Sequence, residues 1–194
     1  MRRYTIEEYL ALEKKTGQKL EYHDGRVVAM AGGTVPHSVI STNMLVELGI
    51  GLKGKPCRAL NSDARLALEK IGSYVFADAF VVCGEIETSD IVPHAITNAS
   101  VIIEVLSDST IAYDQGEKFY KYRQLDSFKE YMLIRQNMPV VETYVRRDKD
   151  LWKIARYEGL DAILDIETLD VSIPLSDIYG GVAFEAEEPL TPLP

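Results

Sequence analysis

The chain has 194 residues, a length that suits one domain with a sizeable core. Its hydrophobic fraction of 46% and charged fraction of 26% are those of an ordinary globular protein. No apolar stretch reaches membrane-spanning length, and Glu7 and Glu8 interrupt the N-terminal segment where a signal peptide would need its apolar core. We therefore expect a cytoplasmic protein with no membrane partner.

The net charge of −9 weighs against a protein that coats nucleic acid, because such binding depends on Lys and Arg neutralising phosphates. A local basic cleft is still compatible with this sum, since the field depends on how charges are distributed. The two cysteines, Cys57 and Cys83, form no CxxC pair and lie beside apolar residues. We expect reduced, packed thiols and no zinc site.

The first fifty residues predict a helix, a β-hairpin and a second helix. Thr5 and Glu8 have the spacing of a capping box ahead of an apolar stripe, which indicates a helix over residues 5–15. An Asp-Gly pair between two strand-like runs predicts a hairpin over residues 18–30. Spaced apolar residues then predict a helix over residues 37–52.

Strand patterns dominate the remainder, and the polar segment 84–98 is typical of a loop. The last strands are amphipathic, so we expect them near a sheet edge, with the two most apolar strands at the centre. Residues 1–181 thus predict one α/β (α+β) domain, a mixed β-sheet flanked by helices. The acidic, Pro-containing tail 182–194 is expected to be disordered. The predicted strands are residues 58–68, 74–82, 100–106, 129–135, 140–147 and 151–157, with a helix over 113–125.

Two carboxylates interrupt the most apolar strands. YVFADAFVV is apolar except for Asp78, and SVIIEVL is apolar except for Glu104. An unpaired buried ion costs several kcal/mol, so a cation side chain, backbone donors, protonation or a bound metal must compensate. For either acid alone, a structural ion pair or hydrogen-bonded acid is the more frequent explanation.

The two acids together favour a shared site. Sequential strands usually neighbour each other, so the two carboxylates can converge on one hard cation. Mg²⁺ prefers one or two carboxylates, with water and substrate phosphate completing its octahedron. Asp78 and Glu104 are therefore the candidate metal ligands.

Lys118 is the third candidate. Helical spacing places it on one face with Asp114, Tyr122 and Leu125, and the last two should point inward. Two interpretations carry equal weight here. Lys118 either pairs with Asp114 on the helix surface, or it points at the sheet and stabilises a phosphoryl transition state.

Taken together, several segments carry a resemblance that none would carry alone. They are EYHDGRVVAMAGGTVPHSVI, SDARLAL, YVFADAFVVCGE, IIEVLSDST, YDQGEKFYKYRQL and KEYMLI. On these segments the chain resembles the Uma family of restriction-endonuclease-like proteins, within the PD-(D/E)XK nuclease superfamily. The resemblance extends from TIEEYLALE to IPLSDIYGGV, nearly the whole chain.

The resemblance implies a restriction-endonuclease-like fold, Mg²⁺ as cofactor (with Mn²⁺ as substitute) and DNA phosphodiester hydrolysis. It implies that Asp78 and Glu104 are the acidic residues of the two half-motifs. This chain departs from the pattern twice. Ala77 replaces the proline, and Leu106 occupies the position that usually holds the strand lysine. Lys118, on the following helix, is the candidate replacement.

Two further residues are secondary candidates. Glu21 lies on the first hairpin strand, in an E-Y-x-D-G stretch similar to that of the family, although an exposed strand glutamate is the commoner finding. His37 opens the second helix on its apolar face, where a hydrogen-bonded packing histidine is as frequent as a functional one. His23 carries no signal of its own.

Two functions of different classes compete. The first is a Mg²⁺-dependent DNA endonuclease, for which a homodimer would supply the two sites that a double-strand cut needs. The second is a catalytically silent module that binds nucleic acid or protein on a nuclease scaffold, favoured by the acidic balance and by Leu106. Metal titration separates the two, because a retained site binds Mn²⁺.

Overall fold

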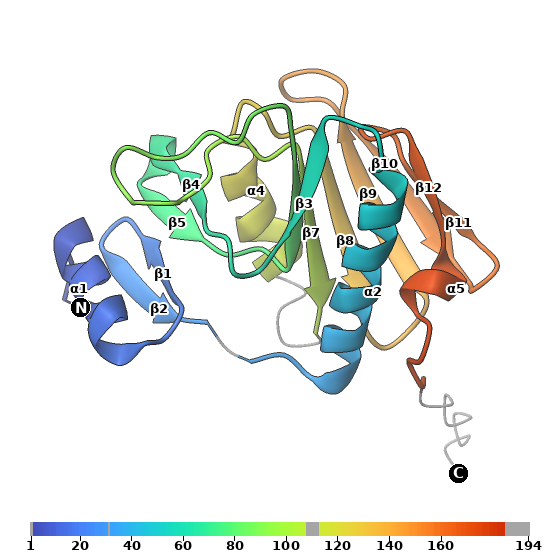
Figure 1. Ribbon diagram of the computed structural model, residues 1–194, viewed down its shortest axis with the longest axis horizontal. Helices are drawn as coiled ribbons and strands as arrows, with labels where there is room; N and C mark the ends of the chain where they lie inside the picture. The colour runs from blue at the N-terminus through green and yellow to red at the C-terminus, as the bar shows by residue number, and fades with distance from the viewer. Residues whose placement is uncertain (1, 31, 108–112, 185–194) are drawn as a thin grey trace, which may run out of the picture.

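The computed structural model describes residues 2–30, 32–107 and 113–184 (Figure 1). These residues form a small four-stranded sheet at the N-terminal end, a larger six-stranded sheet, a separate two-stranded hairpin and several helices. The predicted mixed sheet flanked by helices is confirmed. Val182 and Phe184 still pack against the core, while residues 185–194 of the predicted tail lie outside the described residues.

Helix α1 (Ile6–Thr16) begins and ends where the sequence predicts. The Thr5 hydroxyl accepts the Glu8 N–H at 3.2 Å, and the Glu8 carboxylate accepts the Thr5 N–H at 3.0 Å. This reciprocal capping box satisfies two backbone donors of the first turn. Gly17 ends the helix with a φ of 66°, which glycine adopts without steric cost.

The four-stranded sheet has the order β2-β1-β5-β4 and is antiparallel throughout. The predicted hairpin is its first half, with strands that pair across the Asp24-Gly25 turn. Helix α1 packs beside this sheet and buries Tyr9 against Leu20 and Tyr22. The strands are β1 (Leu20–His23), β2 (Arg26–Ala29), β4 (Leu66–Leu68) and β5 (Ser73–Val75).

The six-stranded sheet has the order β10-β9-β8-β7-β6-β3, and only its central β7–β8 pair is parallel. The amphipathic β10 lies at one edge, as predicted. Of the two most apolar strands, β7 is central and β6 lies next to the other edge. The strands are β3 (Cys57–Asn61), β6 (Ala79–Cys83), β7 (Val101–Leu106), β8 (Glu130–Arg135), β9 (Val140–Arg146) and β10 (Trp152–Glu158).

Two of the predicted strands are wrong as single elements. The segment 58–68 divides into β3 and β4, and the segment 74–82 divides into β5 and β6. Each pair belongs to two different sheets, so both segments cross from one sheet to the other. Asp78 lies at the second break, and its carboxylate accepts the Val105 N–H at 2.7 Å. The Asp78 side chain thus accepts a hydrogen bond from the backbone at the point where the β6–β7 ladder ends.

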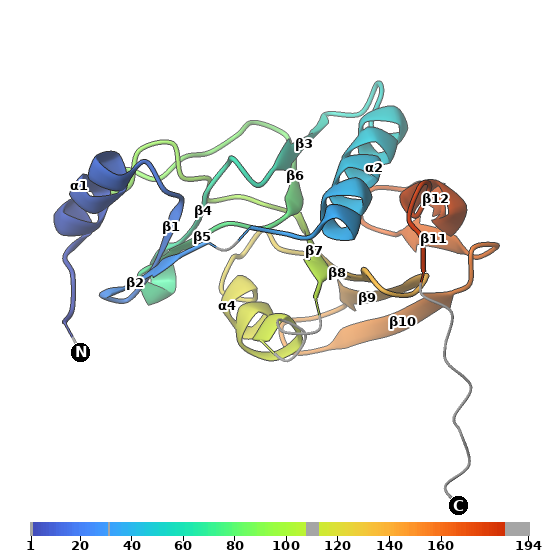
Figure 2. The ribbon, with the colours of Figure 1, turned by 90° about the horizontal axis from the view of Figure 1, so that it is seen from below.

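Helices and a hairpin cover both faces of the large sheet (Figure 2). Helix α2 (Val35–Gly51) lies on one face together with the C-terminal elements, for which the sequence analysis made no prediction. On the other face the predicted helix 113–125 is a π-helical turn (Asp114–Lys118) followed by α4 (Phe119–Tyr122). The C-terminal elements are β11 (Ile163–Ile166), β12 (Val171–Pro174) and α5 (Leu175–Ile178).

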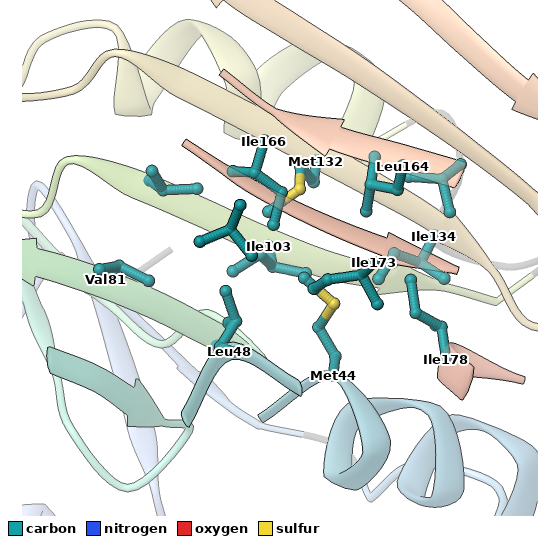
Figure 3. Close-up of a cluster of buried hydrophobic side chains, with 14 of the residues drawn as sticks. Met44, Leu48, Val81, Ile103, Met132, Ile134, Leu164, Ile166, Ile173 and Ile178 are labelled. Atoms are coloured by element: carbon teal, nitrogen blue, oxygen red, sulfur yellow. The ribbon is translucent and has the colours of Figure 1, made fainter. Parts of the chain in front are cut away.

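The apolar core lies between α2, the C-terminal elements and one face of the large sheet. Met44 and Leu48 of α2 point toward Ile103 of β7 and Met132 of β8 (Figure 3). All four side chains are at most 1% exposed. This layer holds β7 in place from behind, so the opposite face of the same strand is a rigid support for polar groups.

The cysteines correct the sequence analysis: Cys57 and Cys83 form a disulfide and are not reduced thiols. They pair directly across β3 and β6, with their Cα atoms 3.9 Å apart. Directly opposed residues of antiparallel strands come close enough to bond, whatever their separation in the chain. The spacing of 26 residues carries no hint of this register.

None of the helices in the described part of the chain has the length and apolar character of a membrane span.

Candidate active site

Strand register brings the two predicted carboxylates together. Ala79 of β6 pairs with Ile103 of β7, and Asp78 and Glu104 are the residues next to this last pair of the ladder. Asp78 Oδ2 accepts the N–H of Val105, the residue after Glu104, at 2.7 Å. The negative charge of Asp78 acts on Glu104 and helps raise the pKa of that carboxyl group. The two acids therefore face each other on the side of the sheet away from the α2 core.

Glu104 is buried in the centre of β7, with 2% of its surface exposed. The Tyr122 hydroxyl donates to Glu104 Oε1 at 2.6 Å, and the Lys118 ammonium lies 2.8 Å from the same oxygen. Burial raises the pKa of Glu104 to about 8, despite the neighbouring Lys118. The acid thus sits where a further positive charge would favour its ionised form.

Lys118 reaches the sheet from the π-helical turn. Its ammonium lies 2.8 Å from Glu104 Oε1 and 3.4 Å from Asp114 Oδ1. The pair with Asp114 exists, but it is buried and does not lie on the helix surface, and the side chain also points inward at Glu104. Although burial disfavours the ammonium, the carboxylates of Glu104, Asp114 and Glu21 raise the pKa of Lys118 above its ordinary range. The lysine is charged and held against Glu104.

His37 joins the site from the first turn of α2. The Thr34 side chain caps this helix by accepting the His37 N–H at 3.2 Å. His37 Nε2 lies 3.1 Å from Asp78 Oδ2, the oxygen that also accepts the Val105 N–H. The hydrogen bond to Asp78 raises the pKa of the imidazole. Two donors therefore fix the orientation of the Asp78 carboxylate.

Glu21 approaches from the other sheet. Its Oε1 accepts the Phe76 N–H at 3.0 Å, and its Oε2 lies 3.1 Å from His23 Nε2. Burial opposes ionisation of Glu21, but the His23 hydrogen bond and the charge of Lys118 lower its pKa overall. Phe76 precedes Asp78 by two residues. The break between β5 and β6 thus brings Glu21 to the same site, and its side chain is not the exposed one that is commoner on such strands.

The structure brings all five predicted residues together: Asp78, Glu104, Lys118, Glu21 and His37. Two buried residues were not predicted: His23, which lies beside Glu21, and Lys121, which lies beside His23. The signal that could have found His23 is its spacing of two from Glu21, which places both side chains on one face of β1. No comparable signal exists for Lys121, because its contact with His23 spans 98 residues of the chain.

The donor set fits a hard divalent cation with few protein ligands. Asp78 and Glu104 are opposed carboxylates, and Mg²⁺ commonly takes one or two of them with water in the remaining positions. Burial disfavours the ionised form of Glu104, and a bound cation would offset this cost. Among residues 2–30, 32–107 and 113–184, no cluster of three or more His, Cys, Asp or Glu is arranged to hold a metal. Any cation here would keep much of its hydration.

Known proteins resemble this chain over most of its length. Residues 6–176 match the model of the Uma2 family, described as "Putative restriction endonuclease". "Uncharacterized protein slr1290" of Synechocystis sp. (strain ATCC 27184 / PCC 6803 / Kazusa) is 33% identical over 178 residues, which cover 92% of each chain. "Uncharacterized protein sll1609" of the same organism is 29% identical over 167 residues, 86% of this chain and 94% of the other.

A solved structure shares the fold. It is the crystal structure of a "putative nuclease belonging to DUF820" from Anabaena variabilis ATCC 29413, with a TM-score of 0.71 and 16% sequence identity. The match covers 91% of this chain and 97% of that chain. The predicted restriction-endonuclease-like fold is therefore confirmed.

Proposed function

The chain belongs to the Uma2 family of "Putative restriction endonuclease" proteins, and we propose that it is a Mg²⁺-dependent endonuclease that hydrolyses DNA phosphodiester bonds. One observation carries the proposal. Asp78 and Glu104 face each other across adjoining strands, and the Lys118 ammonium lies 2.8 Å from Glu104. Two opposed acids with a buried lysine are the groups that metal-assisted phosphodiester hydrolysis needs.

Asp78 and Glu104 would hold the cation, with Glu21 as a third acidic group beside it. When bound, the cation polarises the phosphate and lowers the pKa of water. His37 and the Val105 N–H orient the Asp78 carboxylate, and the Tyr122 hydroxyl orients that of Glu104. These donors hold both acids on a rigid sheet before any substrate arrives.

Lys118 supplies the fixed positive charge. It replaces the strand lysine of the superfamily pattern, because Leu106 at that position is buried among apolar side chains. From the helix, the ammonium reaches the Glu104 carboxylate of β7. Its three N–H donors can stabilise the charge that develops on a phosphate oxygen. Lys118 therefore acts on the substrate and not as a ligand of the cation.

The alternative function is a catalytically silent module that binds nucleic acid or protein. The Lys118–Glu104 pair favours it, because this ion pair already compensates part of the buried charge without any cation. The net charge of −9 favours it as well. A homodimer, which a double-strand cut would require, remains a prediction that light scattering can measure.

Nicking of supercoiled plasmid in Mg²⁺ or Mn²⁺ tests the endonuclease. We expect cleavage by the wild type and a loss on the order of a hundredfold or more in Lys118→Met, since removal of one transition-state contact costs that much. Asp78→Asn should also lose cleavage. Lys70→Met is the matched control, because Lys70 is an exposed lysine whose pair with Asp126 lies on the surface. It should cleave at the wild-type rate.

Calorimetry with Mn²⁺ separates the two functions. The endonuclease requires that the wild type binds Mn²⁺, that Lys118→Met still binds it and that Asp78→Asn does not. Equal Mn²⁺ binding by wild type and Asp78→Asn would refute the metal site. A wild type that neither binds Mn²⁺ nor cleaves DNA or RNA would refute the endonuclease and favour the silent module. Circular dichroism of each variant confirms that the compared proteins are folded.

A further inference from the structure

A chain of hydrogen bonds links the site helix to Glu21 through a histidine outside the proposed catalytic set. Lys121 Nζ lies 3.3 Å from His23 Nδ1, and His23 Nε2 lies 3.1 Å from Glu21 Oε2. The other Glu21 oxygen accepts the Phe76 N–H at 3.0 Å. Both oxygens of Glu21 therefore accept a hydrogen bond. One of the two donors is His23, which is in turn in contact with Lys121.

The donor inventory assigns the tautomer of His23. A lysine ammonium has three donors and no acceptor, so His23 Nδ1 must accept from Lys121 and carries no proton. A neutral imidazole has its single proton on the other nitrogen, and Nε2 therefore donates to Glu21 Oε2. The direction of every hydrogen bond in the chain follows from the lysine at its end.

The surroundings leave these side chains little freedom. His23 is 8% exposed and Lys121 is 9% exposed. Strand β1 lies between β2 and β5; Glu21 pairs with β2, and His23 pairs with both neighbouring strands. Lys121 is held further by the Tyr113 hydroxyl at 3.1 Å and the Glu117 carboxylate at 2.7 Å. Thermal motion can reorient Glu21 only by breaking buried hydrogen bonds.

We infer that His23, in the tautomer imposed by Lys121, is a positioning residue that holds the Glu21 carboxylate in the site beside Lys118. The inference rests on the proposed function, in which Glu21 is the third acidic group beside the cation. Groups that orient a metal ligand from behind typically change metal affinity tenfold to a hundredfold when they are replaced. His23 touches neither substrate nor cation, so its effect passes through Glu21.

Mn²⁺ affinity of four proteins, measured by calorimetry, tests the inference. In His23→Leu the donor to Glu21 is lost, and we expect Mn²⁺ to bind on the order of tenfold to a hundredfold more weakly. In His23→Gln the side-chain amide can still donate to Glu21 and accept from Lys121, so the affinity should stay within about threefold of the wild type. Ser73→Ala is the control, because Ser73 is a buried polar residue paired with His23 across β1 and β5.

The imidazole nitrogen chemical shifts of His23 give a readout that needs no metal. We expect the Nε2–H tautomer in the wild type and a change of tautomer or a mixed population in Lys121→Met. Wild-type Mn²⁺ affinity in His23→Leu would overturn the inference, as would a Gln variant as weak as the Leu variant or an Nδ1–H tautomer in the wild type. If His23→Leu does not fold, His23→Gln and Lys121→Met decide the question. If the wild type takes no Mn²⁺, the proposed function fails, and the tautomer alone decides whether His23 holds Glu21.

Discussion

Strand β7 separates two regions of opposite character. On one face, Ile103 packs with Met132 and Leu48 in an apolar cluster. On the other face, Glu104 lies among Tyr122, Lys118 and the opposed Asp78. The same backbone supports both, and Ile103 and Glu104 are each at most 2% exposed.

The difference between the two faces shows how the protein divides stability and function. Apolar burial contributes to stability in proportion to the area removed from water, and it needs no specific partner. A buried carboxylate contributes to stability only if its partners are in place, and it is otherwise a cost. The apolar burial on one face can therefore offset the free-energy cost of the buried charges on the other face. Substitutions on the two faces should have separable effects.

The largest expected effect is on the apolar face. Ile103 is 1% exposed, and Ile103→Ala removes its buried methyl groups. This substitution should lower the free energy of unfolding by about 2–5 kcal/mol. Urea denaturation measures this loss. The nicking rate per folded molecule should stay unchanged, because Ile103 points away from Asp78 and Lys118. Ile154→Ala on β10, at a residue 63% exposed, is the control and should change stability by less than about 0.5 kcal/mol.

The charged face should make stability depend on pH. Burial raises the pKa of Glu104 to about 8 in the folded protein, from an ordinary value of 4.5. Between these values the folded state binds more protons than the unfolded state, so the contribution of Glu104 to stability falls as pH rises from about 5 to 8. With a chelator present, we expect the free energy of unfolding to fall by an amount on the order of a few kcal/mol across this pH range.

Glu104→Gln isolates this contribution, because the amide keeps the shape of the side chain and does not titrate. Thermal or urea unfolding of both proteins at several pH values, with a chelator present, gives the comparison. The wild type should lose stability relative to Glu104→Gln across the window from pH 5 to 8. Parallel pH profiles would show that Glu104 is already compensated by Lys118 in the folded protein.

The smallest expected effect is that of Asp78→Asn on stability. The amide oxygen can still accept the Val105 N–H, and the loss of the Asp78 charge relieves its repulsion with Glu104. We expect the free energy of unfolding in chelator to stay within about 1 kcal/mol of the wild type or to rise. A drop beyond about 2 kcal/mol would mean that the His37–Asp78 pair is mainly structural.

The sequence by itself determined the elements that depend on neighbouring residues. The capping box at Thr5 and Glu8, the hairpin at Asp24-Gly25 and the apolar stripe of α2 all follow from spacing within one or two turns. The isolated charges of Asp78 and Glu104 in apolar segments were equally visible, because the cost of burying a charge depends on the residue type. Helical periodicity offered the inward direction of Lys118 as one of two equal interpretations, since Tyr122 and Leu125 mark the buried face, and the fold decided between them.

Tertiary structure alone decided which segments meet. The segments 58–68 and 74–82 read as continuous strands, yet each passes between two sheets, because strand continuity depends on partners elsewhere in the chain. The pairing of Cys57 with Cys83 depends on the β3–β6 register in the same way. The contact of Lys121 with His23 has the same origin, since it joins a helix of one layer to a strand of another. Local patterns carry the propensity of a segment, whereas contacts across the fold depend on the packing of all segments together.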